Sequence, residues 1–92
     1  MTKPKFALGQ LVATPDALRA LEEAGQSPAF FLDRHVQSDW AEVDAEDWKA
    51  NDEALVAGER LLSAYRTLKG VRIWIITEAD RSSTCVLLPE NY

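Results

Sequence analysis

Hydrophobic and polar positions change their pattern at Gly58, which divides the chain into two halves. After Gly58, residues 60–67, 71–77 and 82–88 form three runs rich in β-branched and aromatic residues. The middle run has apolar residues at both alternating sets of positions, as is typical of a central strand. The pattern therefore predicts a three-stranded antiparallel β-meander over residues 59–92.

Short turn signals separate these runs. Leu68-Lys69-Gly70 fits a hairpin loop in which the glycine supplies a positive φ. Glu78-Ala79-Asp80-Arg81 is polar and fits a second turn, whose Asp80 could bond the turn backbone. Pro89 has no amide hydrogen and should end the last strand.

The first half carries signals for about three helices. Thr14-Pro15-Asp16 combines an N-cap hydroxyl, a proline at the first helical position and an acid in the first turn. Ser27-Pro28 repeats this signal, and Asp44 is the third N-cap. Gly25 and Gly58 fit helix C-termini. Apolar residues follow each start at helical spacing.

The elements add up to an α+β domain: helices in residues 14–58, followed by the antiparallel sheet in 59–92. Phe6–Ala13 is short and apolar, so residues 1–13 are a lead-in or an extra edge strand. A chain of 92 residues forms a single domain, 1–92. We expect Trp48 and Trp74 to lie in the core.

Composition removes several functional classes. The sequence holds one cysteine, Cys85, and one histidine, so it predicts no intramolecular disulfide, no metal site and no cofactor. No apolar run approaches the length of a membrane span. We therefore expect a cytoplasmic protein without membrane contact.

The net charge of −5 is unevenly distributed. Residues 39–59 contain eight acids and one lysine, which gives this segment a charge of −7. That distribution argues against broad DNA binding, which needs many phosphate contacts. It favours either a solvated helix face or a surface for a basic partner protein. The residues that we expect to contact such a partner are Asp39, Trp40, Glu42, Asp47, Asp52 and Glu53.

One polar constellation could support chemistry. Metal-independent RNA cleavage needs an acid, a base and cations on the phosphate. His35 and Glu78 could serve as acid and base, with Arg81 as the third catalytic residue. Phosphate could be held by Arg60, Arg72 and Arg81. These residues also have ordinary structural interpretations: His35 as a packed core residue, and Glu78 and Arg81 as parts of a solvated turn.

Several stretches resemble a known group of proteins: Arg34-His35, Asp39-Trp40, Leu61–Tyr65, and above all Trp74–Ser82 (WIITEADRS) and Leu87–Tyr92 (LLPENY). Over residues 8–92 the chain is similar to a family of short bacterial proteins carried on plasmids, integrative elements and prophages. Cys85 stands where that pattern suggests a second threonine after Thr84. The resemblance implies genomic context, and no secure activity comes with it.

Three hypotheses remain. The leading one is a small accessory protein of mobile elements, with a regulatory or anti-defence role, that acts by protein–protein interaction. The second is a ribonuclease toxin, since the order of helices then meander is similar to the barnase–RelE group; that is a fold-level analogy. The third is a structural subunit that forms a homodimer through a sheet edge.

Overall fold

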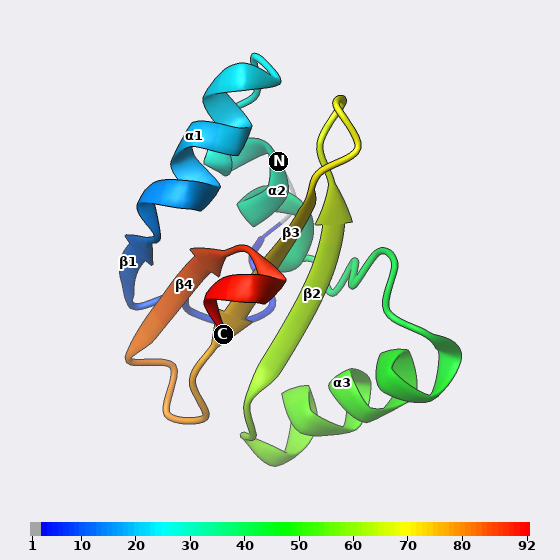
Figure 1. Ribbon diagram of the computed structural model, residues 1–92. Coiled ribbons are helices and arrows are strands. Elements are labelled where there is room, and N and C mark those ends of the chain that lie inside the picture. The colour runs from blue at the N-terminus through cyan, green and yellow to red at the C-terminus, as the bar shows by residue number, and fades with distance from the viewer. Residues whose placement is uncertain (1–2) are drawn as a thin grey trace.

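The computed structural model describes residues 3–92, which form a four-stranded sheet with the first two helices packed on one face and the third beside one edge (Figure 1). The helices are α1 (Pro15–Glu23), α2 (Pro28–His35) and α3 (Ala45–Ala57). Each begins as the sequence predicts, because an N-cap side chain accepts a hydrogen bond from an amide of the first turn. The caps are Thr14, Ser27 and Asp44. Gly58 ends α3 at φ 75°.

The sheet differs from the predicted one. Its strands are β1 (Gln10–Ala13), β2 (Leu61–Arg66), β3 (Arg72–Thr77) and β4 (Ser83–Leu87), in the order β1-β4-β3-β2. The predicted three-stranded antiparallel meander is wrong, because β1 adds a fourth strand parallel to β4 and makes the sheet mixed. A four-residue strand with no hairpin partner carries no local signal for such pairing, since only the tertiary fold brings it to β4.

Gly9 lets β1 approach its partner. This residue has φ +65°, and a Cβ atom there would lie 2.4 Å from the carbonyl oxygens of Arg81 and Ser82. The chain can therefore press against the turn between β3 and β4 only with glycine at this position. Its neighbour Gln10 then donates its amide hydrogen to the Ser82 carbonyl at 2.9 Å and starts the parallel ladder.

Strand register divides the side chains of the sheet into two faces. The covered face carries Leu61, Ser63, Tyr65, Ile73, Ile75, Thr77, Thr84 and Val86, all buried. Residues of α1 and α2, including Leu21 and Phe31, join this face in the main core. The open face carries Leu62, Ala64, Trp74, Ile76, Cys85 and Leu87, and four of these are only partly buried.

A second, smaller core lies beside β2, where Trp40 packs with Ala54 of α3 and Leu61. Trp40 is 0% exposed, whereas Trp48 is 36% exposed. The expected core position of Trp48 is therefore wrong, and Trp40 is the tryptophan that anchors α3. Its indole Nε1–H donates to Asp52 of α3 at 2.9 Å, which satisfies the polar atom of a buried ring.

The open face has only a short cover. The 3₁₀-helix η1 (Pro89–Asn91) lies in front of the sheet in Figure 1, whereas α2 lies behind it. The Asn91 side chain fixes η1 by contacting Thr14 and Asp16 at the start of α1, at 2.8 and 3.0 Å. Within residues 3–92, no helix is both long and apolar enough to span a membrane.

Candidate functional site

Four polar side chains form a continuous hydrogen-bonded chain inside the covered face. Ser63 Oγ contacts His35 Nδ1, and His35 Nε2 lies 2.9 Å from Thr77 Oγ1. Thr77 Oγ1 lies 2.8 Å from Thr84 Oγ1, which donates to the Leu8 carbonyl at 2.7 Å. All four side chains are fully buried. The chain thus joins α2, three strands and the lead-in to β1.

The Leu8 carbonyl at one end of the chain can only accept, and this fixes which group donates in each hydrogen bond. Thr84 has a single hydroxyl hydrogen and gives it to Leu8, so Thr84 must accept from Thr77. Thr77 has then used its own hydrogen and must accept from His35 Nε2. In the neutral imidazole, the other nitrogen, Nδ1, is an acceptor and takes the Ser63 hydrogen. This hydrogen-bond pattern assigns His35 to the neutral Nε2–H tautomer.

Burial keeps this imidazole neutral. Desolvation, with a smaller contribution from the positive charge of Arg81, lowers the pKa of His35 from 6.5 to about 4. Protonation of Nδ1 would require the Ser63 hydroxyl to rotate and accept a hydrogen bond in place of donating one. Both geometry and electrostatics therefore favour the neutral ring at neutral pH.

Aromatic rings seal this histidine from solvent. Phe6 and Trp40 pack edge-on against the imidazole, with ring centroids at 5.2 and 5.6 Å. Lys5 donates its backbone hydrogen to the Val36 carbonyl at 2.8 Å and so ties the lead-in to the end of α2. Ser63 beside His35 is the pairing that activates nucleophiles in enzymes, but both are 0% exposed. The arrangement is suited to holding elements together.

The three residues predicted for RNA cleavage do not share a solvent-facing site. Glu78 is exposed, whereas His35 is enclosed. The guanidinium of Arg81 lies over the Phe6 ring, 5.6 Å from its centroid. Arg81 also donates to backbone carbonyls of Glu59, Glu78 and Ala54, at 2.6, 3.1 and 3.4 Å. The guanidinium thus clamps the end of α3 to the β3–β4 turn.

The other two predicted phosphate ligands lie on the open side of the sheet, near opposite ends. Arg60 pairs with Glu78 at 3.8 Å and donates to the Tyr92 hydroxyl at 2.8 Å. Arg72 is exposed and stands directly opposite Arg66 in the β2–β3 register. The three predicted phosphate ligands therefore do not converge on one point.

The residues predicted to bind a partner divide into two groups. Some are engaged inside the molecule: Trp40 is buried, Asp52 holds its indole, Asp39 pairs with Arg34 at 2.7 Å, and Glu42 pairs with Arg66 at 2.9 Å. Asp47 and Glu53 are exposed on α3 and have no ion pair among the described residues 3–92. Only the outer side of α3 thus offers free carboxylates from this predicted set.

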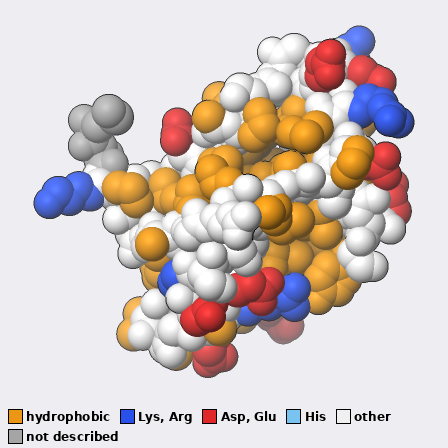
Figure 2. All heavy atoms as spheres, turned by 90° about the vertical axis from the view of Figure 1, so that its left-hand side faces the viewer, with side chains coloured by type: hydrophobic (Ala, Val, Ile, Leu, Met, Phe, Trp, Pro, Cys, Tyr) orange, Lys and Arg blue, Asp and Glu red, His pale blue; other side chains and the backbone are white. Residues whose placement is uncertain are grey.

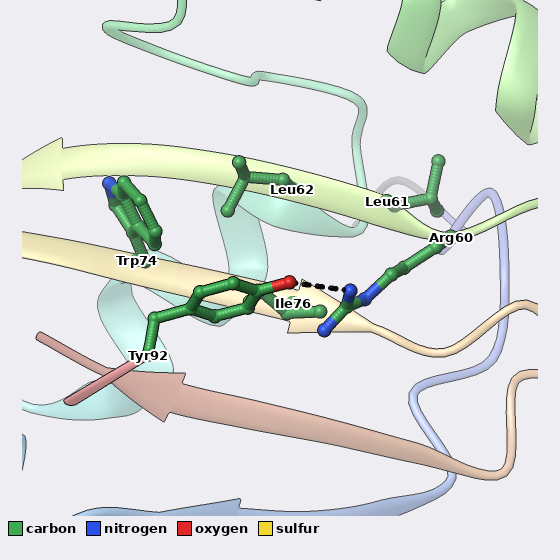
Figure 3. A pocket seen from close by; sticks show the side chains of 6 residues that line it. All are labelled: Arg60, Leu61, Leu62, Trp74, Ile76 and Tyr92. Carbon is green, nitrogen blue, oxygen red and sulfur yellow. Dashed lines mark hydrogen bonds between the residues drawn. The ribbon is translucent and has the colours of Figure 1, made fainter. Parts of the chain in front are cut away.

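The open face contains a shallow hollow that the sequence did not indicate. It has a volume of about 280 Å³ and is lined by Arg60, Leu61, Leu62, Trp74, Ile76 and Tyr92. Figure 3 shows the Tyr92 side chain lying across β3, with its hydroxyl hydrogen-bonded to Arg60. The Tyr92 ring also meets Trp74 edge-on at 5.8 Å between centroids. The floor is aliphatic and aromatic, and the guanidinium of Arg60 is the one charged group that lines the hollow.

The two edges of the sheet differ in their protection. Along β2, the Asn51 amide bonds both backbone groups of Leu62, and residues 40–42 bond those of Ala64. Within residues 3–92 no strand pairs with the outer edge of β1, where Leu11 and Val12 are 54% and 44% exposed. Figure 2 views this side of the molecule and shows hydrophobic side chains in its middle, with charged ones toward its margins.

Sequence reasoning missed Ser63 and Thr77 as partners of His35. Each occupies the buried alternating position of its strand, among Leu61, Tyr65 and Ile75. A hydroxyl at a core position of a strand is a usable signal, because buried polar groups need partners. His35, the one histidine of the chain, lies on an apolar helix face and was the natural hydrogen-bond partner for these hydroxyls.

Comparisons with known proteins give no functional label. No family model, curated protein or solved structure matched the chain. In the described part of the chain, no group of three or more His, Cys, Asp or Glu side chains is placed to hold a metal ion.

Proposed function

We propose that the protein acts by binding a partner protein through the outer side of α3. In this proposal it is a small cytoplasmic accessory protein of bacterial mobile elements, in a regulatory or anti-defence role. The observation that carries the proposal is a set of exposed carboxylates on one helix: Glu46, Asp47 and Glu53 have no ion pair in the described structure. Unpaired charge of one sign steers and orients a partner of the opposite sign.

The partner would carry a basic surface. Glu46 and Glu53 are seven residues apart and so lie on the same side of α3, two turns from each other. Lys49 lies between them and is the one cation of the segment 39–59. A partner presenting lysine or arginine at a spacing of about 10 Å would meet both carboxylates.

A charge-change experiment tests this proposal. Tagged wild type, Glu46→Gln/Glu53→Lys and the matched control Glu22→Gln/Glu23→Lys on α1 would each capture proteins from a native bacterial lysate. The two double variants change the net charge equally. We expect a protein with a basic surface that wild type and the α1 control retain and the α3 variant loses. Identical captures by all three forms would contradict the proposal.

The exposed edge of β1 favours homodimer formation as a second candidate. In the parallel ladder, Gln10 and Thr14 donate toward β4, so Leu11 and Ala13 direct their backbone groups outward. These groups are free to pair with a second copy of β1. Size-exclusion chromatography with light scattering would detect the dimer, and Leu11→Lys should abolish it while Leu68→Lys, on a turn, should not.

The ribonuclease hypothesis is not carried forward as a further candidate. The imidazole of His35, which would act as acid or base, is enclosed, and both of its ring nitrogens are hydrogen-bonded. The Arg81 guanidinium is bonded to backbone carbonyls. Within residues 3–92, no observation specifically favours RNA cleavage.

A further inference from the structure

We propose that the open face of the sheet binds an amphipathic helix of a partner protein, with apolar side chains of the helix over the partly exposed Leu62, Ala64 and Trp74 and one carboxylate of the helix on Arg72. This site lies on a different element from α3 and carries the opposite charge, so it goes beyond the function proposed above.

Cross-strand register arranges the open face in rows. Leu62 pairs with Ile76, and Ile76 pairs with Cys85. The next row holds Ala64, Trp74 and Leu87. The two rows are about 7 Å apart, because same-face residues are two apart along a strand. Together they form an apolar surface across three strands, and η1 and Tyr92 cover only part of it.

Arg72 supplies the charge that such an occupant must match. It stands directly opposite Arg66 in the register, and like charges in this position destabilise a sheet. Arg66 is neutralised by Glu42 at 2.9 Å. Arg72 is exposed, and its side chain has neither ion pair nor hydrogen bond within residues 3–92. An unpaired guanidinium at the end of an apolar surface fits a ligand with both apolar groups and a carboxylate.

The backbone chemistry of the face favours a helix over an extended segment. The face offers side chains and no free strand edge, so an extended peptide lying on it would bury backbone groups without partners. A helix satisfies its own backbone and presents an apolar stripe. The other face of the same sheet is covered by α1 and α2, so helix packing suits its twist.

The same residues argue against single-stranded RNA as the occupant. RNA binding on a sheet uses several exposed aromatic rings and several free cations. Here Arg60 and Arg66 are already ion-paired, and the Tyr92 ring meets Trp74 edge-on. Most of the floor is aliphatic. One free cation and an aliphatic floor suit a protein helix better than a polyanion.

The test uses a random 16-residue peptide library displayed on phage and selected on the 92-residue chain. The expected product is a set of sequences with apolar residues at i, i+3, i+4 and i+7 and an Asp or Glu about one turn beyond. The best peptide is then synthesised with that acid and with lysine in its place. Arg72→Glu should weaken binding of the acidic peptide by about tenfold or more and strengthen binding of the lysine peptide.

A matched control separates the site from net charge. Arg19→Glu on α1 changes the charge equally at an exposed residue away from the open face, and it should leave both affinities unchanged. The three indole N–H signals in a ¹⁵N NMR titration locate the peptide. We expect the Trp74 signal to shift, while Trp40, buried and bonded to Asp52, and Trp48 on α3 stay in place.

Three outcomes would overturn the proposal: selected peptides without an acidic amphipathic pattern, a shift of Trp48 in place of Trp74, or equal effects of Arg72→Glu and Arg19→Glu. A twelve-nucleotide uridine oligomer is titrated in the same NMR experiment as a comparison ligand. If it shifts Trp74 and the peptide does not, the face binds RNA and the helix assignment fails. Thermal unfolding of each variant verifies that the fold is intact.

Discussion

The two faces of one sheet treat polar groups in opposite ways. On the covered face, His35, Ser63, Thr77 and Thr84 are enclosed, and each hydrogen has an acceptor. On the open face, Arg72 is a charged group without any partner in the described structure. A buried polar network with complete hydrogen bonding holds the structure in one arrangement. An exposed charge at the end of an apolar surface adds nothing to the fold and remains available for binding.

The comparison shows that titratable residues alone do not locate a site. The only histidine is the residue that acid–base chemistry would single out, yet its neighbours assign it to the fold. Trp74 and Arg72 carry no catalytic signature, yet they lie where solvent and a partner can reach. Accessibility and unmet hydrogen bonds are therefore the better guide in this molecule.

His35→Ala should have the largest effect on stability. It removes a fully buried ring packed against Phe6 and Trp40, and it leaves the Ser63 hydrogen without its acceptor. The cavity and the unpaired hydroxyl should together lower the free energy of unfolding by about 4 kcal/mol. Urea denaturation followed by circular dichroism measures this. A loss below about 1 kcal/mol, as expected for the turn control Leu68→Ala, would show that the covered face does not depend on this network.

Arg81→Ala should have the next largest effect. The variant removes charge-assisted bonds to the carbonyls of Glu59 and Glu78, with an expected loss of about 2 kcal/mol. Arg81→Lys should recover only part of it, because an ammonium lacks the planar fork. RNA from cells that express wild type should remain intact. Growth arrest with RNA fragmentation, relieved by Arg81→Ala at unchanged protein levels, would contradict this structural role and support a catalytic one.

Stability should depend on pH through His35. The pKa of this group in the folded protein is about 4, below 6.5 in the unfolded chain, so the unfolded state binds the proton more tightly. Its contribution is complete above pH 6.5 and is lost as the pH falls toward 4. Between pH 7 and pH 5 the free energy of unfolding should fall by about 2 kcal/mol from this residue alone. His35→Gln should remove that part of the slope, and an unchanged slope would contradict the assignment.

Arg72→Thr should have the smallest effect on stability, and the effect should be stabilising. It relieves the repulsion with Arg66 and introduces a residue that suits strands. The free energy of unfolding should therefore rise by about 0.3 kcal/mol. Arg66→Thr is the paired comparison, because it breaks the contact with Glu42. Differential scanning calorimetry can rank the two. A large loss for Arg72→Thr would mean that this charge serves the fold, and the contrast between the faces would fail.

The local elements could be read from the sequence because their signals are local. Thr14, Ser27 and Asp44 start helices through their own side chains, and Gly58 and Gly70 adopt the positive φ that their turns need. Strand pairing from a distance has no such signal. The parallel register of β1 with β4 depends on Gly9 fitting against the Ser82 backbone, a contact between residues 73 positions apart.

The candidate sites were harder to predict for the same reason. Trp40 and Trp48 lie in similar polar surroundings in the sequence, and only the packing of α3 decides which one is buried. The hollow on the open face depends on Tyr92 returning across Trp74, which alternation along a strand cannot show. The pairing of His35 with Ser63 and Thr77 likewise joins α2 to two strands.

The most direct test of the contrast between the faces is an NMR titration of the His35 ring in protein labelled with ¹⁵N at its one histidine. The covered face, as described, predicts a single species with hydrogen on Nε2 and a pKa of about 4. Such a result would establish that the imidazole is a sealed part of the fold. A pKa near 6.5, or exchange between the two tautomers, would show that solvent reaches the ring, and the division of the sheet into a structural face and a binding face would be wrong.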